Sequence, residues 1–474
     1  MNPLRADHIS PLDMFKIGVG PSSSHTVGPM VAALEFRKQL EEIIESGATK
    51  GRELTVRVEL YGSLSLTGAG HQTDGAVCAG LFGHSPRLST PDEIWSATDV
   101  LRKNPYLPFG DSSKDQGKFK FHPDQDLKWL EWTMDGKPLP HPNTMRFLTL
   151  DGERIVAESI ILSVGGGFVE PVDSITWERK PAGSSTVLFD LPYPYNSAQE
   201  FVEQCQKSKL KPWEIVIANE SKRGLSESEL RRKLSDILKV FAGCIERGLK
   251  AEGILPGGLH VKRRAKALHE RMLAGEAISV YSSPAGLKPS IYAIAVNEEN
   301  AAGGRVVTAP TNGSAGLIPA VFRTLQEGNN LSEEMLQNGL ITASVVGALV
   351  KTHASISGAE VGCQGEVGTS CAMAAAGAVA MLGGSAAQIE QAAEIGIEHH
   401  LGMTCDPIKG LVQVPCIERN AMGAVKALNA AELALACDGS HLISLDRALE
   451  VMKQTGLDMN QKYKETATGG LALG

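Results

Sequence analysis

The chain has 474 residues, of which 42% are hydrophobic and 21% are charged, as expected for a globular protein of two or three domains. Its net charge of −8 and the lack of a basic tract argue against nucleic acid or an anionic membrane as a partner. The longest apolar runs are about twelve residues, short of the ~20 that cross a bilayer, and MNPLRADHISPLDMF lacks a signal-peptide core, so we expect a cytoplasmic protein.

The first polar motif is MFKIGVGPSSSHTVGPM, which leads into a predicted helix over 31–46. Serine hydroxyls at a helix start accept hydrogen bonds from free amides, and the same amides can hold a carboxylate. One serine is enough for capping. The motif therefore carries more polar groups than capping needs, which are Ser22, Ser23, Ser24 and His25.

Residues 53–61 alternate in the manner of a strand and run into the glycine-rich segment GSLSLTGAGHQTDG. Short side chains and exposed backbone at such a turn allow close approach of a ligand. His71 is a candidate proton-transfer group whose tautomer Asp74 would fix. From this segment alone, a structural turn histidine is the favoured alternative.

The N-terminal region combines strand and helix patterns, which predicts an α+β domain over 1–165. Further strands are expected at 118–121, 146–150 and 155–164, with a helix at 92–102. The Gly-, Pro- and Ser-rich segment 166–196 is expected to be a linker.

Helical patterns dominate over 197–474 and predict an all-α domain. Capping boxes at Ser226 and Ser385 predict helices through about 247 and 398. The motif APTNGSAG precedes an apolar helical run at 317–325, where Asn312 and Ser314 again offer polar groups at a helix start.

Eight cysteines in a large cytoplasmic chain favour reduced thiols over a disulfide framework. Cys363, Cys405 and Cys416 lie in Gly- and Pro-rich turns between apolar helices. Their wide spacing fits neither a zinc ribbon nor a ferredoxin. Three thiolates on a 4Fe-4S cluster would leave one iron open as a Lewis acid. On spacing alone, ordinary buried cysteines are an equally good interpretation.

Four motifs together, KIGVGPSSSHTVGPM, YGSLSLTGAGHQTD, APTNGSAG and GCQGEVG with CDPIKGLVQVPCIERN, resemble the single-chain bacterial iron-sulfur L-serine dehydratases over nearly the whole chain. The resemblance implies an N-terminal domain of the allosteric-substrate-binding type, an all-α domain that carries a 4Fe-4S cluster, and a homodimer. It implies conversion of L-serine to pyruvate and ammonia, which feeds gluconeogenesis. By motif matching, the cluster ligands would be Cys363, Cys405 and Cys416.

Elimination of water from serine needs help at the hydroxyl and a base for the α-proton. The resemblance makes His71 the first candidate for the base, with His25 and His353 as rivals. Residues expected to position the substrate are Ser22, Ser23, Ser24, His25, Asn312 and Ser314, with Lys288 and Tyr281 as weaker candidates. The mechanism predicts that motifs of both domains serve one active site.

This chain ends GGLALG, whereas well-studied members of the resembled family end in a cysteine that caps the fourth iron. This difference puts autoinhibition by the tail in doubt and leaves open whether water or another group would occupy that iron. A pyridoxal phosphate enzyme would need a Schiff-base lysine, and no lysine stands in such a motif. An iron-sulfur sensor would leave SSSHT and GHQTD without a role. Threonine and cysteine stay open as alternative substrates. They differ from serine by one methyl group or by sulfur in place of oxygen, which changes the volume required of the substrate pocket only slightly.

Overall fold

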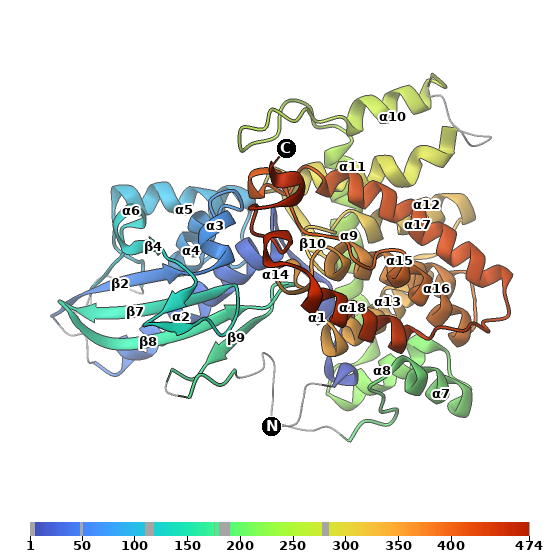
Figure 1. The fold of residues 1–474 in the computed structure, drawn as a ribbon, viewed down its shortest axis with the longest axis horizontal. Helices are drawn as coiled ribbons and strands as arrows, with labels where there is room; N and C mark the ends of the chain where they lie inside the picture. The colour runs from blue at the N-terminus through green and yellow to red at the C-terminus, as the bar shows by residue number, and fades with distance from the viewer. Residues whose placement is uncertain are drawn as a thin grey trace. The chain divides into compact units, whose positions relative to one another are not determined.

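The computed structural model describes residues 5–47, 51–109, 118–174, 176–179, 190–276 and 284–473. The chain divides into two compact units (Figure 1). The sheet unit is Gly18–Ser184, and the helical unit combines Met1–Ile17 with Ser185–Gly474. The first residues of the chain therefore belong to the helical unit.

The sheet unit is built on a mixed sheet in the order β3-β2-β7-β8-β9, with β4 also paired to β2. Strand β2 runs parallel to β3 and β4 and antiparallel to β7, and β7, β8 and β9 are successively antiparallel. The strands are β2 (Glu53–Leu60), β3 (Lys118–Lys120), β4 (Leu127–Trp129), β7 (Thr144–Asp151), β8 (Arg154–Ser163) and β9 (Val169–Val172), and a separate ribbon comprises β5 (Thr133–Met134) and β6 (Lys137–Pro138).

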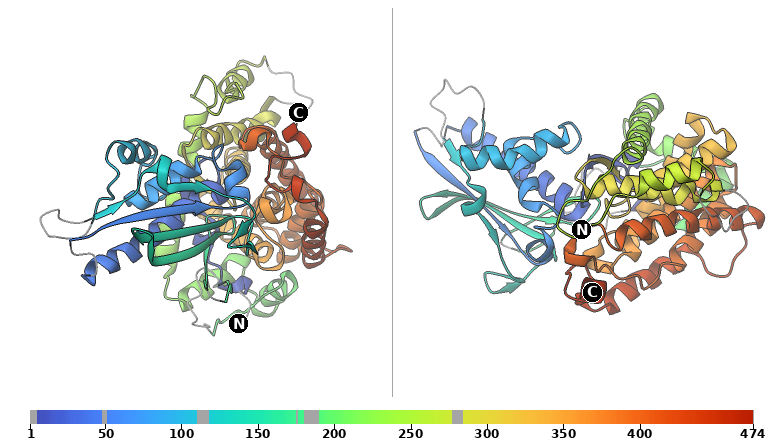
Figure 2. Two further views of the ribbon diagram at one scale, coloured as in Figure 1. Left: turned by 60° about the vertical axis from the view of Figure 1, so that its left-hand side comes forward. Right: turned by 90° about the horizontal axis from the view of Figure 1, so that it is seen from above.

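Helices α2, α4 and α5 pack against one face of this sheet (Figure 2). The helical segments of the unit are η2 (Ser23–Val27), α2 (Gly28–Glu45), α3 (Ser63–Thr67), α4 (Thr73–Phe82), α5 (Pro91–Lys103) and α6 (Pro123–Asp126). The expected helices at 31–46 and 92–102 are confirmed as α2 and α5.

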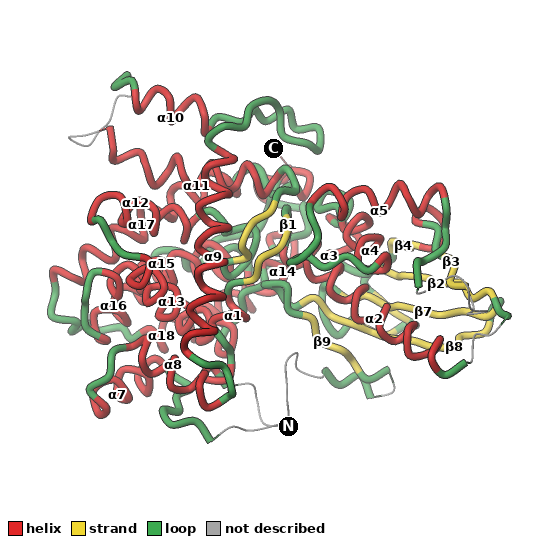
Figure 3. Tube along the Cα trace, turned by 180° about the vertical axis from the view of Figure 1, so that it is seen from behind, coloured by secondary structure: helices red, strands yellow, loops and turns green. Residues whose placement is uncertain are grey.

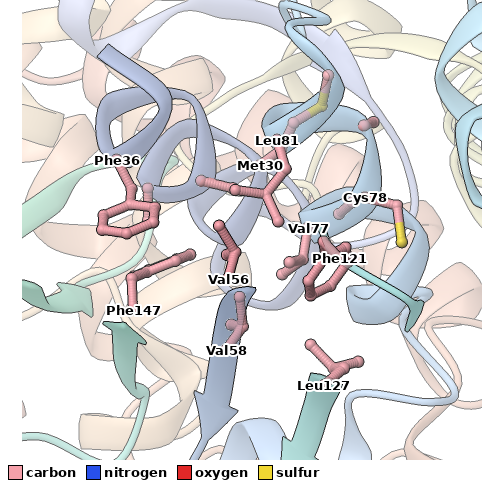
Figure 4. Close-up of a cluster of buried hydrophobic side chains, with 14 of the residues drawn as sticks. Met30, Phe36, Val56, Val58, Val77, Cys78, Leu81, Phe121, Leu127 and Phe147 are labelled. Carbon is pink, nitrogen blue, oxygen red and sulfur yellow. The ribbon is translucent and has the colours of Figure 1, made fainter. Parts of the chain in front are cut away.

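The core of the sheet unit follows from the period of two in β2. Val56 and Val58 are fully buried and face side chains of α2 and α4 (Figure 4). Phe36 of α2 stacks on Phe147 of β7 with ring centroids 5.2 Å apart. The alternation read in the sequence thus selects the face that the helices cover, and the expected strands are confirmed.

The other unit is largely helical, as Figure 3 shows. Its long helices are α7 (Ala198–Ser208), α8 (Pro212–Lys222), α9 (Glu227–Gly248), α10 (Ala265–Leu273), α11 (Lys288–Ala301), α12 (Leu317–Asn329), α13 (Glu333–His353), α15 (Thr369–Met381), α16 (Ala386–Glu398), α17 (Cys416–Ala436) and α18 (Leu445–Asp458). The shorter ones are η1 (Ala6–His8), α1 (Pro11–Met14), η3 (Pro284–Leu287), α14 (Gly358–Val361), η4 (Gln364–Gly368), η5 (Ile408–Gly410), η6 (Gln461–Tyr463) and η7 (Gly470–Leu473).

The helix starts agree with the capping signals in part. Ser385 caps α16 with a complete capping box, and its hydroxyl accepts a hydrogen bond from the amide of Gln388. At the start of α9, the hydroxyl of Ser226 accepts a hydrogen bond from the amide of Glu229. The second bond of a capping box, from the Ser226 amide to the Glu229 carboxylate, is not formed there. The sequence therefore predicted both helix starts correctly, but the complete capping box predicted at Ser226 is wrong.

Two expectations need correction. The helical unit also contains a strand, β10 (Arg305–Thr308), which pairs with β1 (Lys16–Val19), so an all-α description of the C-terminal region is wrong in that detail. The sheet extends past residue 165, because β9 pairs with β8 inside the segment expected to be a linker. Among the described residues, no helix is long and apolar enough to cross a membrane.

Candidate active site

Three buried thiols of the helical unit come from separate turns. Cys363 lies between Gly362 and η4. The φ of Gly362 is 77°, a conformation that glycine adopts readily, and it turns the chain sharply after α14. Cys405 lies in the loop between α16 and η5, and Cys416 is the first residue of α17. All three cysteines are buried, so the fold keeps these thiols away from water.

Two of the thiols converge on one carboxyl group. Oε1 of Glu366 lies 3.8 Å from Sγ of Cys363 and 3.6 Å from Sγ of Cys405. One ligand atom from each of these three residues lies within 4.8 Å of the other two. Cys416 interacts electrostatically with Cys363 and Glu366. The structure therefore brings the predicted thiols together around a carboxyl group that the sequence analysis did not single out.

Burial and mutual contact together set the electrostatics of this group. Contact with Cys363, followed by burial, raises the pKa of Cys405 well above its ordinary value. Burial, reinforced by Glu465, raises the pKa of Glu366 to about 7. Burial also raises the pKa of Cys416. Without a metal, these groups favour their neutral forms, because charge is poorly solvated there.

Arg419 supplies the positive charge beside the thiols. Burial lowers the pKa of its guanidinium, but the neighbouring thiols Cys363 and Cys416 outweigh that and raise it overall. The guanidinium donates hydrogen bonds to the carbonyl of Thr404 at 2.6 Å and to Oδ1 of Asp406 at 3.1 Å. A cation held this way favours thiolates over thiols.

Two glycines make room for the Glu366 carboxyl group. A Cβ at Gly358 would lie 2.5 Å from Oε1 of Glu366 and 3.1 Å from Sγ of Cys405. A Cβ at Gly313 would lie 2.9 Å from Oε2 of the same carboxyl group. The absence of side chains at both positions therefore allows the carboxyl group to reach the thiols.

The APTNGSAG loop adjoins the thiols through its backbone and Thr311. The hydroxyl of Thr311 hydrogen-bonds the Glu366 side chain and lies 3.1 Å from Oγ of Ser314. Nδ2 of Asn420 donates to the carbonyls of Gly313 at 2.7 Å and Cys416 at 2.9 Å. The sequence pattern did not indicate these contacts, although Glu366 and Asn420 lie within the cysteine motifs, in GEVG and CIERN.

The two loop residues predicted to bind substrate hydrogen-bond within the protein. Oδ1 of Asn312 accepts from Thr308 at 2.6 Å, and its Nδ2 donates to Asn300 at 3.0 Å. The hydroxyl of Ser314 donates to backbone carbonyls of the same loop. Both side chains are fully buried, which fixes the shape of the loop.

The C-terminal segment holds the backbone of Cys405 on both sides. The Cys405 amide donates to the carbonyl of Tyr463 at 2.8 Å, and its carbonyl accepts from the amide of Glu465 at 2.7 Å. Oδ2 of Asp406, the next residue, accepts from the amide of Leu471 at 2.9 Å. Residues far beyond the cysteine motifs thus set the position of one thiol.

The serine motif forms a hydrogen-bonded group in the sheet unit. Ser22 caps η2, and its hydroxyl accepts from the amide of His25 and lies 3.2 Å from the hydroxyl of Ser24. Oγ of Ser24 lies 2.8 Å from Nδ1 of His25, and Oγ of Ser63 lies 3.0 Å from its Nε2. Ser23 is buried in the same turn.

His71 is fully buried, and one of its ring nitrogens has no hydrogen-bond partner within the described part of the chain. Nδ1 lies 3.0 Å from the carbonyl oxygen of Thr67, so it carries the proton and donates it. That bond, rather than one to Asp74 as expected from the sequence, orients the ring. Nε2 therefore presents a free lone pair. Burial lowers the pKa of His71 to about 4.

The two histidines lie side by side. The ring centroids of His25 and His71 are 4.6 Å apart. Burial, followed by the neighbouring His71, lowers the pKa of His25 well below its ordinary value. Both rings are thus neutral at neutral pH, and the structure groups them with Ser22, Ser23 and Ser24 as the sequence suggested.

His353, the remaining rival for the base, and Lys288, a weaker candidate for substrate contact, have other partners. Nε2 of His353 bonds the carbonyl of Asn196, and Nζ of Lys288 pairs with Glu327 at 2.6 Å. Tyr281 lies outside the described residues. Cys371, which was not predicted to be a site residue, is buried in α15, where burial raises its pKa to about 12. None of the three described residues belongs to the thiol group or the histidine pair.

Two protein-family models, each describing a separate chain, match different parts of this one polypeptide. The serine dehydratase beta chain model matches residues 10–174, and the serine dehydratase alpha chain model matches residues 207–472. The chain is 46% identical to L-serine dehydratase of Streptomyces coelicolor, over 98% of both chains. It is 44% identical to L-serine dehydratase 2 of Escherichia coli, over 98% of both chains. With L-serine dehydratase 1 of the same organism the identity is 42%, over 98% of this chain and 99% of the relative.

Proposed function

Because this chain belongs to the serine dehydratase family, with the beta-chain and alpha-chain models matched in one polypeptide, we propose that it is an L-serine dehydratase. In this lyase reaction the α-proton and the hydroxyl of L-serine leave as water. The resulting 2-aminoacrylate tautomerises to an imine, which hydrolyses to pyruvate and ammonia. The names of the full-length relatives support this assignment.

The observation that carries the proposal is the convergence of buried thiols in the helical unit. We propose that Cys363, Cys405 and Cys416 hold a 4Fe-4S cluster. Thiolates are the ligands that such clusters use, and a buried donor set beside Arg419 fits that requirement. With three protein ligands, the bound cluster would supply one open iron as a Lewis acid for the departing hydroxyl.

His71 is the proposed base for the α-proton. Its Nδ1–H is held by the Thr67 carbonyl, so Nε2 is the basic atom, and no protein group competes for it among the described residues. A buried neutral imidazole is already in the form that accepts a proton. His25, whose ring lies beside that of His71, is proposed to assist through its two ring nitrogens, which lie within hydrogen-bond distance of Ser24 and Ser63.

The hydroxyls of Ser22, Ser23 and Ser24, together with Asn312 and Ser314, are proposed to hold the substrate carboxylate and ammonium. The three hydroxyls lie at the N-terminal end of η2, where that of Ser22 also accepts from the amide of His25. Asn312 and Ser314 would act from a loop whose shape is fixed by their bonds to Thr308 and to the backbone. A rigid loop orients substrate at little entropic cost.

The fold of the sheet unit, the oligomeric state and the metabolic role belong to the same proposal. We propose the allosteric-substrate-binding fold for the sheet unit, which the mixed sheet with helices on one face supports. A cytoplasmic homodimer and a role in gluconeogenesis are proposed on the family resemblance. Sedimentation of the purified protein tests the dimer.

The test is pyruvate formation from L-serine by protein purified without oxygen, with iron and sulfide measured on the same sample. Cys405→Ala should lose both iron and turnover. His71→Ala should keep the iron and lose turnover by roughly 10²-fold or more, the usual contribution of a general base. Cys437→Ala is the matched control, because Cys437 is exposed and should affect neither.

Two outcomes would overturn parts of the proposal. Loss of iron in His71→Ala would make that residue structural rather than catalytic. A wild-type protein with its full iron content that turns over L-threonine or L-cysteine but not L-serine would remove the substrate assignment.

A further inference from the structure

We propose that Cys363, Glu366 and Cys405 also form a binding site for a single thiophilic divalent cation, such as Zn²⁺, Fe²⁺ or Co²⁺. In this site the carboxylate of Glu366 is a ligand and Cys416 is not. The inference concerns metal binding alone and does not depend on the dehydratase reaction.

The separations of the ligand atoms match one ion. A tetrahedral cation with metal–sulfur bonds of about 2.3 Å and a metal–oxygen bond of about 2.1 Å places sulfur and oxygen about 3.6 Å apart. The observed Sγ–Oε1 separations are 3.6 Å from Cys405 and 3.8 Å from Cys363. All three atoms lie within 4.8 Å of one another. In an iron-sulfur cluster each thiolate binds a different iron, so the thiolates surround a larger body than one ion.

The surroundings prepare Glu366 for this role. The carboxyl group is buried and reaches the thiols because Gly358 and Gly313 carry no side chains. Thr311 hydrogen-bonds its side chain, as outer-shell partners do for metal-binding carboxylates. Two sulfurs and one oxygen suit borderline-soft ions better than Mg²⁺ or Ca²⁺.

The charges balance when the ion binds. Two thiol protons and the carboxyl proton leave to solvent, and three negative ligands around a divalent ion carry a net charge of −1. Arg419 beside the thiols offsets that charge. A fourth, tetrahedral position is left for water or an exchangeable ligand. Because the same two thiols serve the proposed cluster, the single ion and the cluster would exclude each other.

The experiment titrates the full-length chain, freed of metal under reducing and oxygen-free conditions, with Co²⁺. The expected result is one Co²⁺ per chain, with sulfur-to-cobalt charge-transfer bands and the visible bands of tetrahedral cobalt. Cys363→Ser and Cys405→Ser should abolish these bands. Glu366→Gln should weaken binding by at least the roughly 10–100-fold that loss of an outer-shell partner costs.

Three controls make the assignment specific. Cys416→Ser should retain the bands with less than about threefold change in affinity, within ordinary context effects for a residue that is not a ligand. Cys437→Ser tests whether any cysteine removal matters, because Cys437 is exposed. Circular dichroism of each variant reports whether the helices are intact, so loss of metal is separated from loss of fold.

Several outcomes would overturn the proposal. Folded wild-type protein that binds no Co²⁺ removes the site. A Cys416→Ser variant as defective as Cys405→Ser, together with a silent Glu366→Gln, would mean that the ion sits among the three thiols. Equal weakening by Cys437→Ser would mean unspecific thiol binding. None of these readouts uses turnover, so failure here leaves the dehydratase proposal to its own test.

Discussion

At the residue scale, the chemistry of the candidate site depends on a few buried titratable side chains. His71 combines an Nδ1 proton held by Thr67, an unpaired Nε2 and full burial. Burial lowers its pKa from 6.5 to about 4 and also lowers the pKa of His25. These two rings should therefore affect stability as well as chemistry.

The pH dependence of stability has a defined sign. Between pH 6.5 and about 4 the unfolded chain binds a proton at residue 71 that the folded chain does not. The free energy of unfolding is therefore highest above pH 6.5 and falls as the pH falls, by up to about 1.4 kcal/mol per pH unit for one such histidine. Urea unfolding at a series of pH values between 7.5 and 5 measures this slope.

The variant that tests this prediction is His71→Gln, and its control is His399→Gln. His71→Gln should flatten the slope even if its stability at pH 7.5 is lower. His399→Gln changes an exposed residue of the helical unit and should leave the slope unchanged. An equal slope in wild type and His71→Gln would show that this histidine is not buried in its neutral form.

The sequence predicted the cysteines but not their neighbours, and the reason is physical. Thiols and histidines carry distinctive chemistry, so Cys363, Cys405 and His71 could be picked out by type. Glu366 and Thr311 are common residues whose importance arises only because folding removes them from water beside the thiols. Likewise, Asp74 was a reasonable partner for His71 by sequence distance, but the carbonyl of Thr67 is the actual one.

At the element scale, the C-terminal segment acts as a strand-like support for Cys405. It pairs with the Cys405 backbone through the Tyr463 carbonyl and the Glu465 amide. Its Leu471 amide bonds Asp406. Helix α18 precedes this segment and ends at Asp458.

Removal of residues 460–474 should therefore lower metal content without unfolding the helices. The Cys405 loop would lose both of its backbone partners while α16 and α17 keep their packing. Iron per chain and Co²⁺ affinity should both fall, by about tenfold or more in affinity, with little change in circular dichroism. Removal of residues 472–474 alone is the control, and an equal loss in that variant would contradict the role of the 463–465 pairing.

At the scale of the whole molecule, the chain enters the helical unit twice. Residues 1–17 belong to that unit, and the chain returns to it only at residue 185. The amide of Tyr195 donates to Asp7, and the hydroxyl of Ser10 donates to Glu220. Phe15 packs edge-on against Phe241 of α9, with ring centroids 6.5 Å apart.

Phe15→Ala should destabilise the helical unit by about 3–5 kcal/mol, the usual cost of removing a buried phenylalanine side chain. Hydrogen exchange followed by mass spectrometry should show faster exchange in α9 and α13 and unchanged exchange in β2 and β7. Leu442→Ala is the control, because Leu442 is 95% exposed. Equal acceleration in both units would mean that they unfold as one.

Local features of this protein could be predicted from the order of its residues. Alternating residues predicted β2, capping serines predicted the starts of α9 and α16, and residue chemistry identified the cysteine and histidine candidates. Such features depend on neighbours in the chain. Three features became visible only in the folded chain: residues 1–17 join the helical unit, Glu366 meets two thiols, and the C-terminal segment holds Cys405. These contacts join residues far apart in sequence, and they form only when burial of apolar surface packs the elements together.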